Sequence, residues 1–223
     1  MKRISHNTYA TIAGVLYLGL VTNVLLVVTC LPLVLLLITT DPALSWPLLA
    51  AAAPLCAPAL SAAFSTFGAF GRGGTTPART FLAAWRATWR RALALGALVT
   101  GVVVVVLVDV RFFADSAAGV AIVPALGVLT VVIVAVALLG LVAIADTPTA
   151  RLRDVVKASL YLGVRRWYLT VVSLAVLGVQ AALFTTMPAI ALGLTAAPAL
   201  YLAWANSRYT LRPVLEIDEV PAH

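Results

Sequence analysis

The chain has 223 residues, of which 63% are hydrophobic and only 10% are charged, and its formal net charge is +7. A soluble domain is typically about one quarter charged, so this composition excludes an ordinary water-soluble protein and indicates one integral membrane domain over residues 1–223. The basic residues lie between apolar runs and form no continuous face, which favours membrane topology over nucleic-acid binding as their role.

Apolar runs of about 20 residues or more predict an all-α polytopic bundle of six membrane-spanning helices. The expected spans cover residues 9–37, 46–70, 92–113, 119–145, 168–185 and 188–205. The first is long enough to tilt or to contain a kink at Pro32. The run from Leu169 to Ala205 is too long for one span, so we expect a break near Met187-Pro188; one tilted helix is the alternative.

Two basic segments between spans, residues 76–91 and 147–166, both begin with Thr-Pro and end with Arg-Arg. Thr at the cap and Pro in the first turn are typical of a helix start. On a helical wheel, one arc of the first segment carries Phe81, Leu82, Trp85 and Trp89. In the second, a shared face carries Leu152, Val156, Ser159, Leu160, Gly163 and Trp167.

Both segments therefore predict amphipathic elbow helices that lie at a membrane surface. Their common pattern indicates a weak internal repeat and a pseudo-symmetric bundle. The alternative is that any cytoplasmic loop between two spans tends to be basic.

The positions of Lys and Arg predict how the chain is oriented. With six spans and an internal N-terminus, all 15 of these residues except Arg111 are cytoplasmic, as the positive-inside rule requires. Five spans would place Arg208 and Arg212 outside. We therefore expect a multi-pass protein with both termini in the cytoplasm.

The expected partner of the basic segments is a bilayer with anionic headgroups. The cations expected to bind headgroups or a docked protein are Arg79, Arg86, Arg90, Arg91, Arg153, Lys157, Arg165 and Arg166. The tryptophans expected to anchor the chain at the interface are Trp85, Trp89 and Trp167.

The sequence contains no catalytic constellation, so we expect no enzyme, metal or cofactor site. The two histidines, His6 and His223, lie near the ends of the chain, and the glycine-rich residues 71–74 indicate a turn. Cys30 and Cys56 both lie in apolar runs, which predicts free thiols that act as small hydrophobic side chains.

Polar residues inside the expected spans are the remaining site candidates. Asp109 lies near the outer end of the third span and is interpreted as a substrate or proton site, or as an interfacial acid paired with Arg111 or a neighbour. Asn23 and Gln180 are expected to hydrogen-bond across helices as packing contacts, with a role in lining a path as the alternative.

Four stretches of the chain resemble the YesL family of bacterial integral membrane proteins, a domain of unknown function. They are Asn23-Val24-Leu25-Leu26 with Leu31-Pro32, residues 57–64 (APALSAAF), the Phe81…Trp85…Trp89 helix, and Asp109-Val110-Arg111-Phe112-Phe113. The resemblance covers roughly residues 9–115. It departs from the family in one respect: about 25 residues separate Pro32 from Pro58, where the family's elements lie a few residues apart.

The resemblance implies a protein of the bacterial inner membrane that is accessory to carbohydrate uptake, because members often accompany genes for carbohydrate ABC importers and glycan breakdown. Importer permease subunits are the implied partners, and the family has no established catalytic residues that could be transferred. The alternative function is a small-solute transporter or channel whose path is lined by Asn23, Asp109 and Gln180. The oligomeric state and the solute stay open.

Overall fold

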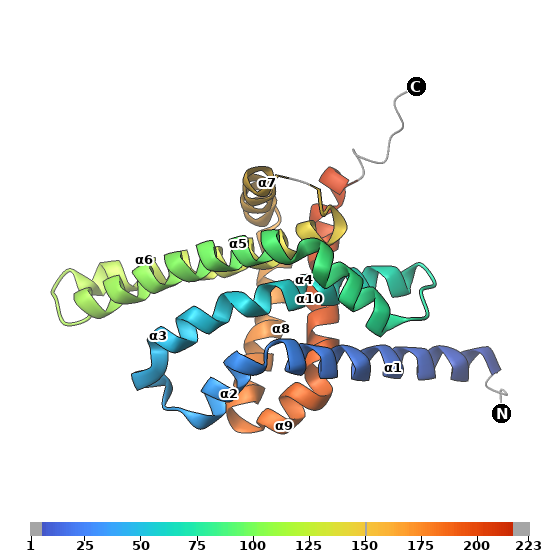
Figure 1. Cartoon of the computed structure of the whole chain (residues 1–223). Helices are drawn as coiled ribbons and strands as arrows, with labels where there is room; N and C mark the ends of the chain where they lie inside the picture. The colour runs from blue at the N-terminus through green and yellow to red at the C-terminus, as the bar shows by residue number, and fades with distance from the viewer. Residues whose placement is uncertain (1–5, 150, 216–223) are drawn as a thin grey trace, which may run out of the picture.

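The computed structural model describes residues 6–149 and 151–215, and within these ranges the chain is helical and contains no strand (Figure 1). The elements in chain order are α1 (His6–Thr29), α2 (Leu31–Thr39), α3 (Pro42–Ala52), the short 3₁₀ helix η1 (Ala53–Cys56), α4 (Ala57–Gly71), α5 (Pro77–Phe113), α6 (Gly119–Asp146), α7 (Leu152–Arg165), α8 (Trp167–Thr186), α9 (Pro188–Ile190), the π-helical turn η2 (Ala191–Thr195) and α10 (Ala196–Leu215).

Within the described ranges, six helical stretches are long and apolar enough to cross a membrane. They are Ile12–Thr29, Pro42–Gly71, Pro77–Phe113, Gly119–Asp146, Trp167–Thr186 and Pro188–Leu211. The prediction of an all-α, multi-pass protein is confirmed. The division of the last apolar run is also confirmed, because α8 ends at Thr186 and the chain restarts as a helix at Pro188.

Prolines determine where the first two spans change direction. α1 ends at Thr29 and α2 begins at Leu31, so the chain breaks just before Pro32 instead of kinking there. Because proline has no backbone N–H, Pro32 cannot donate the hydrogen bond that would continue α1 into α2. Pro54 lies in η1, which joins α3 to α4, so the second span consists of three consecutive helical pieces.

α4 lies at the centre of the core (Figure 1) and is built mainly from small residues. Ala62, Ala63 and Phe64 are fully buried there. The small side chains let neighbouring helices approach closely. A Cβ added to Gly96 of α5 would lie 2.7 Å from the Cβ of Ala57, and this distance shows how near the two helices come.

The glycine-rich segment after α4 is a turn, as the sequence indicates. Gly73 has a φ of 90°, and its N–H donates to the Phe70 carbonyl, while the Gly74 N–H donates to the Ala69 carbonyl. This pair of bonds satisfies the last carbonyls of α4 and needs a residue that tolerates positive φ.

The first basic segment is not a separate helix. Residues 77–91 continue without interruption into the third span as the 37-residue helix α5. Its face toward the rest of the protein carries Phe81, Thr88, Ala92 and Leu95, all buried. Leu82, Trp85 and Trp89, which share the predicted apolar arc with Phe81, are exposed on the protein.

The second basic segment forms the separate helix α7, but it begins at Leu152 and not at Thr147-Pro148. The Thr147 hydroxyl donates to the Ala143 carbonyl at 2.7 Å, so this threonine closes α6 instead of capping α7. Val155, Ser159 and Leu162 form the buried face of α7, while Leu160 and Trp167, which belong to the predicted apolar face, are exposed. The two basic segments therefore differ in structure despite their similar sequence pattern.

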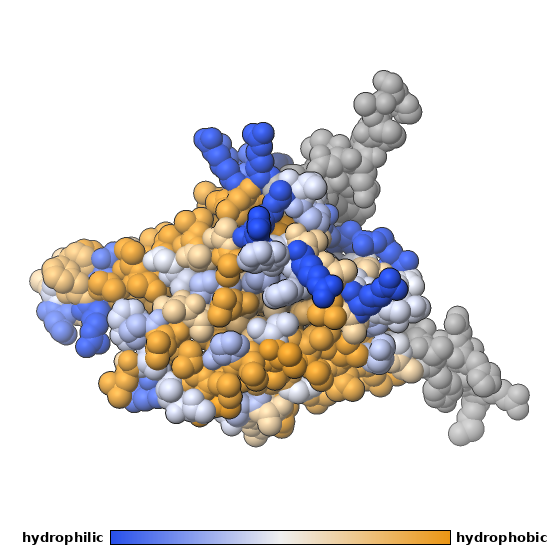
Figure 2. Space-filling model, viewed as in Figure 1, coloured by the Kyte–Doolittle hydropathy of each residue, from blue (hydrophilic) through white to orange (hydrophobic). Residues whose placement is uncertain are grey.

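The long helices fall into two groups that cross each other. In Figure 1, α1, α5 and α6 run across the view, whereas α8 and α10 run up and down it. Figure 2 shows hydrophobic surface over most of this face, hydrophilic residues along the top and right, and a smaller hydrophilic group at the left end. The connection between α5 and α6 lies at that left end in Figure 1.

Candidate functional site

The last span is interrupted near its beginning, and this interruption is the centre of the candidate site. After α8 ends at Thr186, the chain passes through α9 and the π-helical turn η2 before it becomes regular helix at Ala196. Pro198 has no N–H to donate to the carbonyl four residues earlier, which weakens the regular α-helical pattern there. Single π-helical turns within α-helices are frequent at functional sites.

Asn23 of α1 bridges this interruption. Its Nδ2 donates to the Gly193 carbonyl at 2.9 Å, and its Oδ1 accepts from the Ala197 N–H at 2.7 Å. In a regular α-helix the N–H of residue 197 would donate directly to the carbonyl of residue 193. The Asn23 carboxamide, which is 3% exposed, therefore takes the place of one backbone hydrogen bond.

Gln180 of α8 reaches the same turn from another helix. Its Nε2 donates to the Ala191 carbonyl at 2.8 Å, and its Oε1 accepts from the Thr195 hydroxyl at 2.9 Å. Both carboxamides predicted to lie in spans thus bind η2 or its immediate C-terminal neighbour. These are contacts between helices, as the packing interpretation expects.

Asp109 does not join this group. It is half-buried on α5, four residues before that helix ends, and no recorded hydrogen bond or ion pair of the described residues involves it. The pairing with Arg111 or a neighbour that the sequence suggests is therefore not formed. The structure brings Asn23 and Gln180 to one turn and leaves Asp109 apart from it.

A second polar cluster joins the end of α6 to the C-terminal half of α10, and the sequence analysis did not select it. Arg208 Nε lies 3.3 Å from Asp146 Oδ2, and the Asp146 side chain is only 12% exposed. The Arg208 guanidinium also lies over the ring of Trp204, 5.6 Å from its centroid. Asp146 directly follows the apolar run 119–145, and this position is the signal that could have singled it out.

Asn206 is a third amide that the sequence reasoning missed. Its Nδ2 donates to the Leu169 carbonyl and to the Ser173 hydroxyl, the latter at 2.7 Å. Asn206 lies on α10 and both partners lie on α8, so the amide ties these helices together. The partner Ser173 is itself buried, with 1% of its surface exposed, so both polar side chains of this contact lie between the helices.

The predicted cations of the first basic segment lie on the outer side of α5. Arg79, Arg86 and Arg90 are exposed and Arg91 is half-buried. The Arg90 guanidinium lies 5.3 Å from the centroid of the Trp89 ring. Trp85 and Trp89 are exposed in the protein, a position compatible with the interfacial anchoring expected of them.

The predicted cations of the second segment separate into two kinds. Arg153, Lys157 and Arg165 are exposed on α7. Arg166 instead donates from Nη1 to the Tyr209 carbonyl at 2.7 Å and lies 5.5 Å from the centroid of the Tyr209 ring. Arg166 therefore holds α10 beside the junction of α7 and α8, and Trp167 next to it is exposed.

The two cysteines are free thiols, as the sequence predicts. Cys56 is buried in η1 and Cys30 is half-buried between α1 and α2. Among the described residues, no group of three or more His, Cys, Asp or Glu side chains could hold a metal ion.

We predict that Asn23→Leu lowers the free energy of unfolding by about 1 to 2 kcal/mol. Hydrogen bonds between membrane helices contribute on average about 0.6 and at most about 1.7 kcal/mol each, and this variant removes two. Denaturant titration of the full chain in detergent micelles measures the loss.

The matched control for Asn23→Leu is Thr130→Val. Thr130 is half-buried, and its hydroxyl donates at 2.9 Å to the Leu126 carbonyl of its own helix, so no contact between helices is lost. We expect this control to change stability by less than about 0.5 kcal/mol. Equal small losses in the two variants would contradict a bridging role for Asn23.

Comparison of the chain with protein-family models, with curated proteins and with solved structures finds no match. The chemistry of the site is therefore inferred from its own geometry. The carboxamides of Asn23 and Gln180 hydrogen-bond to an interrupted membrane helix. An ion pair joins α6 to α10, and exposed cations lie on α5 and α7.

Proposed function

We propose that this chain is a bacterial inner-membrane protein, with both termini in the cytoplasm, that assists carbohydrate uptake by binding permease subunits of an ABC-type importer. The six apolar helical stretches support the membrane location. The resemblance of residues 9–115 to the YesL family supports the bacterial membrane and the link to carbohydrate import.

The proposed orientation is supported by the helix ends that meet at the second polar cluster. The Asp146–Arg208 pair joins the C-terminal end of α6 to the C-terminal half of α10, and the Arg166–Tyr209 contact adds the N-terminal end of α8. The cations of α7 belong to the same end of the protein, whereas Arg111 lies near the α5–α6 connection. The positive-inside rule then assigns the more basic end to the cytoplasm. The termini themselves, residues 1–5 and 216–223, lie outside the described residues.

The observation that carries the accessory role is the use of the intramembrane carboxamides. Asn23 and Gln180 are each occupied by two partners at the interrupted helix, and three of these four partners are backbone groups. Both side chains hydrogen-bond to backbone groups and therefore have a structural role. We accordingly assign the function to the exposed surface of the protein. Exposed arginines on α5 supply such a surface.

The second candidate is a transporter or channel in its own right, and the interrupted span favours it. Broken helices near the bilayer centre recur in transporters, where freed backbone groups coordinate solutes. Under this alternative, Asn23→Ala and Asp109→Asn each reduce solute flux into vesicles reconstituted with the full chain. Unchanged flux in both variants rules out a path lined by these residues.

We predict the orientation from cysteine labelling of intact cells, in a background where Cys30 and Cys56 are replaced by Ala. An impermeant maleimide should label Ser116→Cys, in the α5–α6 connection. It should label Thr76→Cys and Thr149→Cys only after the membrane is permeabilised. Labelling of residue 76 or 149 in intact cells overturns the proposed orientation.

The proposed function predicts that the tagged chain, purified in mild detergent, enriches permease or ATPase subunits of an importer over an unrelated six-span protein with the same tag. Replacing Arg79, Arg86 and Arg90 by Gln should reduce this enrichment several-fold, because all three are exposed on α5. Arg111→Gln, at the other end of the helix, is the control that should retain it. If quantitative mass spectrometry finds no importer subunit enriched with the native chain, the proposal fails.

A further inference from the structure

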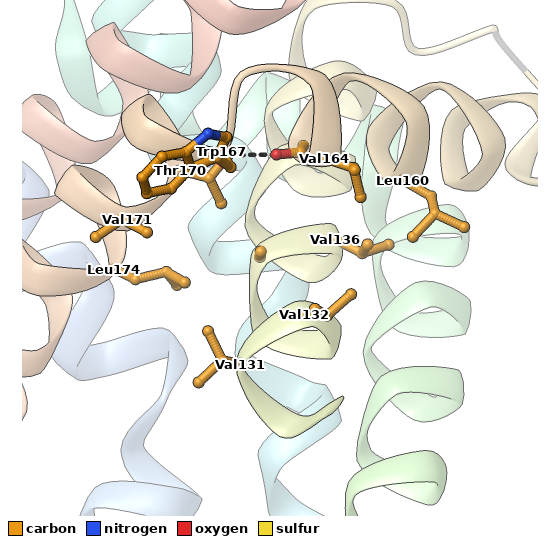
Figure 3. Close-up of a pocket in the computed structure, with 11 residues that line it drawn as sticks. Val131, Val132, Val136, Leu160, Val164, Trp167, Thr170, Val171 and Leu174 are labelled. Carbon is orange, nitrogen blue, oxygen red and sulfur yellow. Dashed lines mark hydrogen bonds between the residues drawn. The ribbon is translucent and has the colours of Figure 1, made fainter. Parts of the chain in front are cut away.

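A hydrophobic groove lies beneath α7, between α6 and α8. Its volume is about 300 Å³, which is at the lower end of the range for ligand pockets. Figure 3 shows Val131 of α6 near Leu174 of α8, Trp167 of α8 above them, and Val136 of α6 below Val164 and Leu160 of α7. Among the described residues that line the groove, the one hydroxyl is that of Thr170, and it donates to the Gly163 carbonyl at 3.3 Å. The lining therefore suits a hydrocarbon chain.

The groove is open to the outside of the protein. Val164 is 63% exposed and Trp167 is 66% exposed at its upper edge, although both are large apolar side chains. The lower part of the groove, at Val131 and Leu174, lies between two helices that are apolar enough to cross a membrane, so we expect the opening there to face lipid. An acyl chain of the surrounding bilayer is therefore the occupant with direct access.

A basic hollow continues the groove across α7. It shares Leu160 and Val164 with the groove and is completed by Lys157, Tyr161 and Arg165. The Arg165 Nη1 donates to the Tyr161 hydroxyl at 3.4 Å, which orients the guanidinium along α7. Neither Lys157 nor Arg165 forms an ion pair within the part of the chain that the structure describes. Two cations are thus available beside a hydrocarbon groove.

We propose that the groove and the basic hollow together form a binding site for one anionic phospholipid. An acyl chain lies between α6 and α8, and the phosphate binds Lys157 and Arg165 at the level of α7. The arrangement matches the lipid in shape and in charge, because the apolar and cationic parts meet at the shared side chains Leu160 and Val164. The site requires only that the chain spans a membrane, and it is independent of any role in carbohydrate uptake.

The site distinguishes Arg165 from its neighbour Arg166. Arg166 is engaged with Tyr209 of α10, so it holds helices together and is not counted as a ligand of the phosphate. Each basic residue near a membrane surface contributes roughly a fivefold gain in affinity for anionic lipid. Removing Lys157 and Arg165 together should therefore weaken binding about 20- to 30-fold.

The test is native mass spectrometry of the full chain in neutral detergent, titrated with phosphatidylglycerol or phosphatidylcholine. We expect phosphatidylglycerol to bind more tightly, and Lys157→Gln with Arg165→Gln to reduce its affinity to that of phosphatidylcholine. The matched control neutralises two other exposed arginines, Arg111→Gln with Arg151→Gln, and should lose far less affinity than the Lys157/Arg165 variant, because neither arginine lines the groove or the basic hollow. Equal losses in the two double variants would show diffuse charge attraction and overturn the site.

The acyl-chain part is tested by phosphatidylglycerol with brominated chains, which quench nearby tryptophan fluorescence. Quenching should be largest for the native chain and should fall in Trp167→Phe, an exposed position where the substitution keeps an aromatic ring. Filling the groove with Val131→Phe and Val171→Phe should weaken binding of both lipids. Soluble glycerol phosphate should not compete at the same concentrations. Quenching unaffected by Trp167→Phe, or full competition by glycerol phosphate, would overturn the groove as the site of the chain.

Discussion

The carboxamide of Asn23 holds an interrupted membrane helix to the first span, and the hydrogen bonding at the start of α10 depends on it. Within the hydrocarbon of a bilayer no water is present to pair a backbone N–H or C=O, so a broken helix must find partners inside the protein. Asn23 supplies one donor and one acceptor to Gly193 and Ala197, the two groups that a regular helix would join to each other. The free-energy cost of the interruption is then small, because the Gly193 carbonyl and the Ala197 N–H each keep a hydrogen bond of normal length.

α10 is consequently held at two places along its length. Asn23 and Gln180 fix its beginning through η2. Near its middle, one helical turn carries both Asn206, which binds Leu169 and Ser173 of α8, and Arg208, which pairs with Asp146 of α6. These polar contacts matter because lipid tails give no hydrophobic drive for helices to associate. The exposed cations of α5 and α7 are left outside this scaffold, and they are the groups available for lipid or for a partner protein.

Much of the fold follows from the sequence, and the failures have physical causes. Long apolar runs predict six spans, and the break near Met187 follows from the length limit of one span and from Pro188. The first basic segment was expected to be separate because Arg90-Arg91 marks a membrane boundary. A membrane boundary is not a helix boundary, and between Pro77 and Phe113 nothing stops the backbone from continuing as α5.

Asn23 and Gln180 could be selected as polar residues in spans, but their partners lie up to 174 positions away, and only the packed structure brings them together. Asp146 was missed because an acid at the end of a span resembles an ordinary loop residue until its partner Arg208 is known.

Amide hydrogen exchange at Ala197, measured by NMR on the full chain in detergent micelles, tests the bridging role of Asn23 most directly. We predict that this amide is protected in the native chain and exchanges at least about tenfold faster in Asn23→Leu, because a local opening free energy of about 1.4 kcal/mol is lost. The amide of Ala203, in the regular part of α10, should keep its exchange rate. Equal protection of Ala197 in the native chain and the variant would contradict the account, because the helix would then be closing its own hydrogen bond without Asn23.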